Sequence, residues 1–548
     1  MHHVAILEKL EYENTSLARK DSVSRATGKF YTPPIIAAYL NAGILSELKK
    51  SASKTIKLVD PFAGDGRLAY WLIKHALEGG FRPRWSVDLW DRDRSNLEEA
   101  ARRLKRFALV AKIDINVSTW VGDSFRRIPR EAPQFDVVLT NPPWEALKPD
   151  RRELLHLSSD DKLLYVKRLR RLDEWLSLAF PHSQPSKKFA GWGTNLSRVG
   201  IEASMRLLRP NGILGLVTPA SFFADQVSLE LRKWLFTRVR PLSVASFPAE
   251  AKLFDKVDHP VVAFTAQRPS KKSFAIQLST FESRTRTFRH EKYKSNLPAL
   301  AEAEYRLPLN ISNDASAVLM TLNRLPTWGN IENGNTGIWS GRELDETNYR
   351  SYLSESGTYK FVKGRMIGRF AVLEEPSSFI REGSVKIPAT ADQYRLAWRD
   401  VSRLNQKRRM HATLIPPGWV TGNSLGVALF KDGDVVRLRA LLAIANSMVF
   451  EAQIRSKLVT THVSLGVVRS ARIPPLTNKK AVGALDRIAR SCLNAGIARQ
   501  SKSEILVAKA FGLSRDEFAC LLPFFPKLEA GEIAALLDRG AWASSFSI

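Results

Sequence analysis

Four consecutive residues, Asn141-Pro142-Pro143-Trp144, place an amide, two prolines and a large aromatic side chain directly after an apolar stretch. The prolines lack an N–H and have a fixed φ, so they end the strand that the apolar stretch predicts and make the following turn rigid. In such a turn the Asn141 side-chain oxygen and the Pro142 carbonyl are two preorganised acceptors for the two N–H donors of an exocyclic amine. Trp144 adds a face on which an aromatic ring can stack. The motif therefore predicts a site for an aromatic amine.

A second candidate site precedes this motif, at the end of the predicted strand 55–60. Asp60 is followed by a turn of small residues, Ala63, Gly64 and Gly66, which allow a ligand to approach the backbone closely. No Lys follows the glycines, and the G-x-G-x-x-G spacing is absent, so the turn is not one of the known phosphate-binding loops. An adenosine without phosphates needs no phosphate cradle, and Asp60 suits a cationic amino-acid tail reached through water.

Two further acidic residues follow predicted strands. Asp91 ends the strand 85–91, where a carboxylate can accept both hydroxyls of a ribose, with Asp93 as the alternative. Asp123 ends the strand 115–123 and can accept a hydrogen bond from an adenine amino group. Each residue alone is more often a solvated acid at a strand end, but three in this order before Asn141 indicate a nucleoside site.

The elements that must position these residues alternate between strand and helix. Predicted strands cover 55–60, 85–91, 115–123, 135–141, 212–219, 242–248 and 259–267, and predicted helices include 67–79, 94–109 and 196–210. This rhythm predicts a doubly wound, mostly parallel sheet of about seven strands, whose last two are close enough in sequence to pair antiparallel. A helical segment rich in Lys and Arg, 146–192, interrupts the rhythm where substrate-covering elements often lie.

The composition restricts the class of protein. The 548 residues include 83 Lys and Arg against 55 Asp and Glu, a formal net charge of +28, which indicates a polyanionic partner such as nucleic acid. Two cysteines cannot make a disulfide framework or a zinc cluster, and we expect no metal site. No apolar run reaches the ~18–20 residues of a membrane span. Together these features favour a cytoplasmic protein without a membrane partner.

The motifs, taken in order, resemble a known enzyme family. "TGKFYTPPIIAAYL" (27–40), "DPFAGDG" (60–66), "NPPW" (141–144) and "TNLSRVGIEASMRLLRPNGILGLVTPASFF" (194–223) resemble the motif series of gamma-class N6-adenine DNA methyltransferases, which use S-adenosyl-L-methionine. The resemblance covers about residues 27–265. It implies an α/β fold class, a Rossmann-like methyltransferase sheet plus a mixed α+β C-terminal target-recognition domain. It also implies methyl transfer to N6 of a flipped-out adenine in double-stranded DNA, as the modification part of a restriction-modification or phage-defence system.

The resemblance assigns roles by position. Cofactor contacts are expected from Tyr31, Thr32, Pro33, Asp60, Pro61, Phe62, Ala63, Gly64, Gly66, Asp91, Asp123 and Phe125. Contacts to the target base are expected from Asn141, Pro142, Pro143 and Trp144, with Phe254 as a candidate second stacking residue. The family often has Tyr or Phe where Trp144 stands, which is a departure. Ser is commoner at the Asn141 position in N4-cytosine enzymes, so adenine is favoured.

The C-terminal half resembles, more loosely, the target-recognition regions of restriction-associated adenine methyltransferases. We predict an N-terminal helical lead (1–28), a catalytic domain (29–270) with the insertion 146–192, a connecting segment (271–325), a target-recognition domain (326–475) and a C-terminal helical region (476–548). Candidate DNA contacts are Arg342, Lys363, Arg365, Arg369, Lys407, Arg408, Arg409, Arg455 and Lys457. Most such residues contact phosphate rather than bases.

Other functions stay open from the sequence. The same fold and motif could act on RNA or on a glutamine side chain of a protein, although a long basic second half suits a duplex better. A non-catalytic DNA-binding subunit with a methylase fold is a third hypothesis, against which the intact motif set argues. The sequence has no nuclease signature, so a separate restriction endonuclease or a second methyltransferase subunit is an expected partner.

Overall fold

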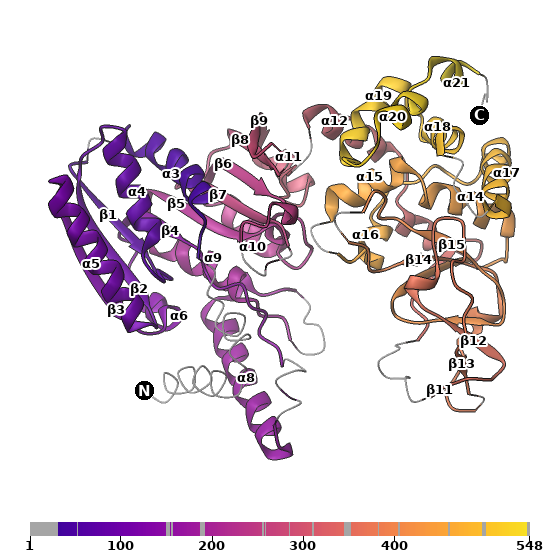
Figure 1. The fold of residues 1–548 in the computed structure, drawn as a ribbon, viewed down its shortest axis with the longest axis horizontal. Coiled ribbons are helices and arrows are strands. Elements are labelled where there is room, and N and C mark those ends of the chain that lie inside the picture. Colours follow the sequence, from indigo (N-terminus) through magenta and orange to yellow (C-terminus); the bar gives the residue numbers. More distant parts are fainter. Residues whose placement is uncertain are drawn as a thin grey trace. The chain divides into compact units, whose positions relative to one another are not determined.

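The computed structural model describes residues 31–544, apart from gaps at 52, 150–153, 155–156, 187–191, 255–256, 258, 284, 310–311, 345–351, 382, 404–405, 459–460 and 496–499. The chain divides into two compact units at Asn310/Ile311, here called unit 1 and unit 2 (Figure 1). The predicted N-terminal helical lead, 1–28, lies outside the described residues.

Unit 1 is built on a nine-stranded sheet of order β3-β2-β1-β4-β5-β7-β6-β8-β9. The strands are β1 (Thr55–Asp60), β2 (Arg84–Asp91), β3 (Ile115–Val121), β4 (Phe135–Thr140), β5 (Leu208–Pro219), β6 (Arg240–Phe247), β7 (Val261–Gln267), β8 (Ser273–Glu282) and β9 (Thr287–Asn296). Strands β3, β2, β1, β4 and β5 run parallel to one another, and β7 pairs antiparallel with both β5 and β6. The predicted doubly wound sheet with an antiparallel last pair is confirmed.

Helices cover the sheet because each strand of its centre is apolar on both sides. Every residue of β4 is buried, as expected for a parallel strand packed from two faces. The helices α3 (Pro34–Leu48), α4 (Arg67–Glu78) and α5 (Arg94–Ala111) pack next to one another along the sheet, while α9 (Leu196–Leu207) packs on β4 and β5 and against α10 (Leu229–Phe236). The chain order reverses between β1 and β4, which is where open α/β sheets bind ligands.

The sheet continues beyond the predicted end of the catalytic domain at residue 270. Strands β8 and β9 and helix α11 (Leu297–Glu302) belong to unit 1, so much of the predicted connecting segment is part of this sheet. The pattern of a half-buried strand is present in the sequence, because Phe274, Ile276 and Leu278 are buried and alternate with the exposed Ser273, Ala275 and Gln277. The strongly charged edge strand β9 obscured it, because edge strands carry charges that prevent aggregation.

Unit 2 contains two small sheets and a set of helices. One sheet has the order β10 (Ile338–Gly341), β17 (Leu425–Phe430), β14 (Arg395–Arg399), β15 (Ala412–Ile415), and the other β11 (Leu353–Ser354), β13 (Phe379–Ile380), β12 (Tyr359–Val362), β16 (Trp419–Thr421). The helices include α12 (Asn313–Thr321), α14 (Val435–Ala445), α15 (Met448–Lys457), α16 (Leu465–Arg469), α17 (Lys479–Ala495), α18 (Gln500–Ala510), α19 (Arg515–Leu521), α20 (Ala530–Leu536) and α21 (Arg539–Ala543). The helices that follow β17 therefore begin at residue 435, well before the predicted 476. The α14 sequence is apolar on nearly all sides, so it lacks the periodicity that distinguishes a helix from a strand.

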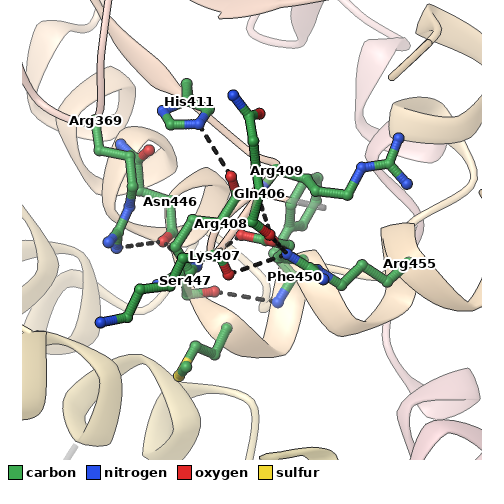
Figure 2. Close-up of polar contacts among 12 residues, drawn as sticks. Arg369, Gln406, Lys407, Arg408, Arg409, His411, Asn446, Ser447, Phe450 and Arg455 are labelled. Carbon is green, nitrogen blue, oxygen red and sulfur yellow. Dashed lines mark hydrogen bonds and ion pairs between the residues drawn. The ribbon is translucent and has the colours of Figure 1, made fainter. Parts of the chain in front are cut away.

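A buried network of charges joins three segments of unit 2, and Figure 2 shows its cations Arg408 and Arg455 with the neighbouring His411. Arg408 binds Glu451 of α15 and Glu504 of α18, each at 2.7 Å, and Arg455 binds the other oxygen of Glu451 at 2.8 Å. Burial alone would raise the pKa of Glu451, but Arg408 and Arg455 outweigh it and lower that pKa to about 2. Breaking one partner of such a network is costly because a buried charge is left alone.

His411 lies beside this network and gives unit 2 a specific response to pH. Its Nε2 donates to the Arg408 carbonyl (3.0 Å), and burial together with nearby Arg399 lowers the pKa of His411 to about 4. The folded state therefore holds a neutral ring, whereas the unfolded chain protonates near pH 6.5. Stability from this group is complete above pH 6.5 and is lost as the pH falls toward 4.

We predict that His411→Gln, which keeps a donor but does not titrate, reduces this acid sensitivity. Between pH 6.5 and 4 the variant should lose less unfolding free energy than the parent, by up to about 3 kcal/mol. Urea denaturation of the full chain across this pH range measures the difference. Parallel stability curves for parent and variant would contradict the assignment.

Candidate active site

The ends of β1 and β2 are tied together by one carboxylate. Asp91 accepts the Gly64 N–H through Oδ2 (2.8 Å) and the Asp93 N–H through Oδ1 (2.9 Å). Each carboxylate oxygen has a second lone pair, so Asp91 keeps the capacity to accept ribose hydroxyls. Asp93 instead caps α5, accepting the Asn96 N–H (3.2 Å), so it is less suited to the role of alternative ligand.

Two glycines shape the turn after β1. Gly64 and Gly66 have φ of +51° and +70°, which side chains rarely adopt. A Cβ at Gly66 would lie 2.6 Å from the Ala100 Cβ, so that glycine allows α4 to pack on α5. Among the residues that the structure describes, a Cβ at Gly64 would approach only the Tyr31 ring, at 3.4 Å. The turn is therefore covered by Tyr31 on this side.

Tyr31 is held over the glycine turn by two neighbours. The guanidinium of Arg67 lies 4.6 Å from the centre of its ring, and Asn96 donates to its hydroxyl at 3.4 Å. Asp65 in turn fixes Arg67 through bonds of 2.7 to 3.2 Å. Arg67 and Asn96 carry no signal in the sequence alone, since both are common surface residues.

Asp60 is the buried acid at the centre of this region. It is 1% exposed, and its Oδ1 accepts the Phe62 N–H at 3.1 Å. Burial raises the pKa of Asp60 to about 7, and the nearby Asp91 and Asp65 add to the rise. A perturbed carboxylate in this place is typical of a functional site, because a solvated strand-end acid would keep its ordinary pKa.

An aromatic wall lies next to these acids. The rings of Phe62 and Phe125 are 4.9 Å apart, and Phe125 also contacts Phe180 at 6.0 Å. Asp123 caps the short helix α6 (Ser124–Arg127) and pairs with two guanidiniums, Arg92 (3.1 Å) and Arg126 (3.3 Å). The structure thus gives Asp123 a capping and ion-pairing role that the sequence did not predict, and its contact with adenine stays a prediction.

The Asn141-Pro142-Pro143-Trp144 motif follows β4 directly, at the point where the strand order reverses. The Asn141 Nδ2 donates to the hydroxyl of Thr32, 3.3 Å away, so two distant motifs meet here. A Cβ at Gly200 of α9 would lie 2.2 Å from the Pro142 Cβ. Gly200 therefore permits the approach of α9 to the rigid turn, a requirement that the sequence analysis missed.

The Trp144 ring is buried against two other aromatic side chains. The residue is 8% exposed, and its ring meets Phe254 edge-on at 5.0 Å and His259 at 5.5 Å. Phe254 thus lies beside Trp144, as expected of a second aromatic residue at this site. His259 was not predicted, although it stands two residues before β7 at the same end of the sheet.

Five of the nine candidate DNA contacts bind groups inside unit 2 and are corrected here. Arg408 and Arg409 are 8% and 2% exposed, and the side chain of Arg369 is 10% exposed and reaches Asn446 and Glu504. The remaining two are held by backbone carbonyls among other groups, namely Arg455 by residues 406, 407 and 524, and Lys457 by residue 470. The sequence alone does not distinguish an arginine that contacts phosphate from one that pairs with a buried glutamate.

The other four lie nearer the surface of unit 2. Arg342 and Lys407 are partly exposed and pair with Asp400 and Glu532, and Arg365 is 71% exposed. Lys363 is half-buried, 5.9 Å from the centre of the Phe361 ring. These four stay candidates for contacts with DNA.

Two absences hold for the described part of the chain. It contains no group of three or more His, Cys, Asp or Glu side chains placed to hold a metal ion. None of its helices has the length and hydropathy that crossing a membrane requires.

Comparison with known proteins finds similarity to restriction-modification methylases. Residues 67–254 match the model of the Eco57I restriction-modification methylase family. The Type II methyltransferase M.VspI of Vibrio sp. (strain 343) is 27% identical over 227 residues, which are 41% of this chain and 45% of that protein. The chain therefore spans less than half the length of this relative. Both findings support a methyltransferase of the restriction-modification type.

Solved structures show the fold that the chain shares. A nuclease-deletion mutant of the Type ISP restriction-modification enzyme LlaGI, in complex with a DNA substrate mimic, has a TM-score of 0.53 at 11% identity, over 86% of this chain and 55% of that one. The Type IIL enzyme MmeI in complex with DNA has a TM-score of 0.51 at 12% identity, over 98% and 75%. At these identities the likeness is one of fold: a Rossmann-like methyltransferase sheet with a further C-terminal domain.

We predict that Gly200→Ala displaces the Pro142 turn and costs about 1–3 kcal/mol of unfolding free energy, as overpacking does. The new methyl group would meet a proline ring that cannot rotate away. Gly466→Ala is the matched control, because an added Cβ at that helical glycine would have no described residue within 4 Å. Denaturant unfolding of both variants measures the effect, and equal stabilities would show that the turn adapts.

We also predict that Asp60→Asn stabilises unit 1 at neutral and higher pH. The folded pKa of Asp60 is raised, so its stability contribution is complete below pH 3.8 and is lost as pH rises through about 7. Asn keeps an acceptor for Phe62 without the charge, so unfolding free energy at pH 8 should rise by up to about 4 kcal/mol. Thermal melts at pH 5 and pH 8 test this, and a gain equal at both pH values would contradict the cause.

Proposed function

We propose that this chain methylates N6 of adenine in double-stranded DNA, using S-adenosyl-L-methionine, as the modification part of a restriction-modification system. The observation that carries the proposal is the Asn141 amide at the carboxyl end of β4, where the strand order reverses, with its donor end bonded to Thr32. The family match supports it, because residues 67–254 include this motif, Asp91 and Asp123. The adenine base, the N6 position and base extrusion are part of the proposal.

The residues of the β1 and β2 ends fit the cofactor. Asp91 has acceptor capacity for a ribose, the Phe62 and Phe125 rings form a wall for an adenine, and the Gly64 side of the turn has only Tyr31 within 4 Å. Asp60 is the acid placed to interact with the cationic methionine end. When bound, S-adenosyl-L-methionine supplies a methyl group already activated on a sulfonium.

The task of the protein is then to orient the target amine. The Asn141 Oδ1 and the Pro142 carbonyl would accept its two N–H groups, which directs the nitrogen lone pair and raises its nucleophilicity. Thr32 holds the amide from the opposite end, and the Gly200 contact fixes the turn. Trp144 and Phe254 would provide the aromatic surroundings of the extruded base, whose removal from the stack costs a few kcal/mol.

Double-stranded DNA is the proposed partner of unit 2 as well. The net charge of +28 and the partly exposed Arg342, Lys363, Arg365 and Lys407 support this. A separate restriction endonuclease or a second methyltransferase subunit is the expected companion, and the bacterial or archaeal cytoplasm is the expected location.

Single-molecule sequencing of DNA from cells that express this chain alone tests the proposal directly. N6-methyladenine in one sequence motif would establish substrate, base and specificity together. If the DNA is unmodified although the protein binds the cofactor, RNA or protein becomes the favoured substrate. Transfer of a labelled methyl group onto each of them tests this. No transfer onto any of them would favour a non-catalytic subunit.

We predict that Asn141→Ala abolishes methyl transfer while leaving the affinity for S-adenosyl-L-homocysteine within about threefold, since the amide is needed only for the amine. Transfer of labelled methyl and calorimetric titration measure the two properties. Asn333→Ala, at an exposed residue of unit 2, is the control. Activity of the Asn141 variant within about threefold of the parent, less than ~1 kcal/mol, would remove the assigned role.

A further inference from the structure

The insertion after Trp144 projects from unit 1, and its two ends are joined by backbone hydrogen bonds. The Leu147 N–H donates to the Thr194 carbonyl (2.9 Å), and the Leu196 N–H donates to the Glu145 carbonyl (2.8 Å). These two bonds bring the ends of residues 148–193, here called the arm, together within a few residues of the Asn141 motif. The base of the arm therefore lies beside the proposed target site.

The main helix of the arm, α8 (Ser159–Ala179), is anchored at its C-terminal half. Leu169, Leu172 and Leu176 are buried there. Trp175 lies 5.1 Å under the guanidinium of Arg126 and 6.5 Å from the Phe180 ring. Phe180 in turn contacts Phe125, 6.0 Å away, in the wall next to Asp60 and Asp91. The helix is thus rigidly attached to the proposed cofactor pocket.

The N-terminal half of α8 is not packed in this way. None of residues 159–168 is buried, and the Leu163 side chain is 72% exposed. Figure 1 shows α8 running out from the body of unit 1 on the side of α6. This is the side that carries the carboxyl end of β3, and therefore those of its parallel neighbours β2, β1 and β4.

The outward face of α8 is basic where the helix leaves the body. Lys167, Arg170 and Arg171 are exposed within about one turn, opposite the buried leucines. Lys167 and Arg171 make no hydrogen bond or ion pair with any residue that the structure describes, and Arg170 lies over the Trp192 ring at 5.4 Å. Between residues 148 and 192 the sequence has ten Lys and Arg and six Asp and Glu, a net charge of +4.

The acids of α8 do not cancel these cations. Asp160 and Asp161 lie in the first turn, where they complement the helix dipole, and Asp161 is bonded to the Ser158 hydroxyl (2.6 Å). Glu174 is exposed on the same face, three and four residues after Arg171 and Arg170, and Asp173 is buried. With Glu174 counted against Lys167, Arg170 and Arg171, this face keeps a charge of +2. A charged helix face is often merely solvated, but this one projects next to a proposed base-binding motif.

We propose that α8 binds the phosphate backbone of duplex DNA beside the base presented to Asn141. The inference rests on the proposed function, since it assumes that DNA is the substrate. Phosphate contacts release counterions and supply sequence-independent affinity, which would offset the cost of extruding the base next to them. Because α8 is anchored on Phe180 and Trp175, those contacts would also fix the duplex relative to the cofactor pocket.

Three variants test this with the full chain. The arm variant carries Lys167→Ala, Arg170→Ala and Arg171→Ala. The control variant carries Lys479→Ala, Lys480→Ala and Arg487→Ala, which removes the same charge from exposed positions of α17 in unit 2. Arg171→Ala alone serves if the triple arm variant fails to bind S-adenosyl-L-homocysteine and so has not folded. Fluorescence anisotropy with a labelled, mixed-sequence DNA duplex gives the affinity over a range of salt concentrations.

The arm variant should bind at least about tenfold more weakly than the parent, with a salt slope smaller by about 2–3, whereas the control should change little. The single variant should lose about one unit of slope. Arm and control variants that agree within about twofold would overturn the role of α8, including the case in which its leucines bind a protein instead. A parent chain that does not bind duplex DNA at all would overturn the proposed function itself.

Discussion

The reversal of strand order between β1 and β4 is the constraint on which the arrangement of unit 1 depends. Strands on either side of that point send their connections to different faces, so the two loops that follow β1 and β4 have no helix crossing between them. Asp60 with its glycine turn and Asn141 with its prolines occupy those two loops. The hydrogen bond from Asn141 to Thr32 then brings a third segment, the lead into α3, to the same place. Residues separated by more than a hundred positions thus become neighbours without any change to the sheet.

The fold of unit 1 was largely predictable, because its strands are short apolar runs that end in turn residues. The bounds of β1 were predicted to the residue, and those of β4 to within one. The missed strands, β8 and β9, form the outer edge, where hydrophobic patterning is weaker. The candidate site residues Asp60, Asp91, Asp123 and Asn141 could be proposed from the sequence because they stand at or just after strand ends. What the sequence could not reveal were partners defined only by distance, such as Gly200 against Pro142 or Arg92 and Arg126 against Asp123.

Unit 2 was harder to predict for a different physical reason. Its basic residues are of two kinds that share one chemistry: Arg408 neutralises buried glutamates, while Arg365 faces water. The two glutamates that pair with Arg408 lie 43 and 96 positions away in the sequence. A strongly positive chain can therefore hold many of its cations inside, and net charge alone overstates the surface available to a polyanion.

The two hydrogen bonds that close the base of the arm have an evolutionary consequence. They join the residues on either side of the insertion, so the rest of unit 1 would keep the same two ends whether the connection were 46 residues long or a short turn. The entropy of closing such a loop grows only slowly with its length. Residues 148–193 can thus be lengthened, shortened or exchanged as a module, provided that the contact of Phe180 with Phe125 is preserved, since this contact seats the arm against the aromatic wall.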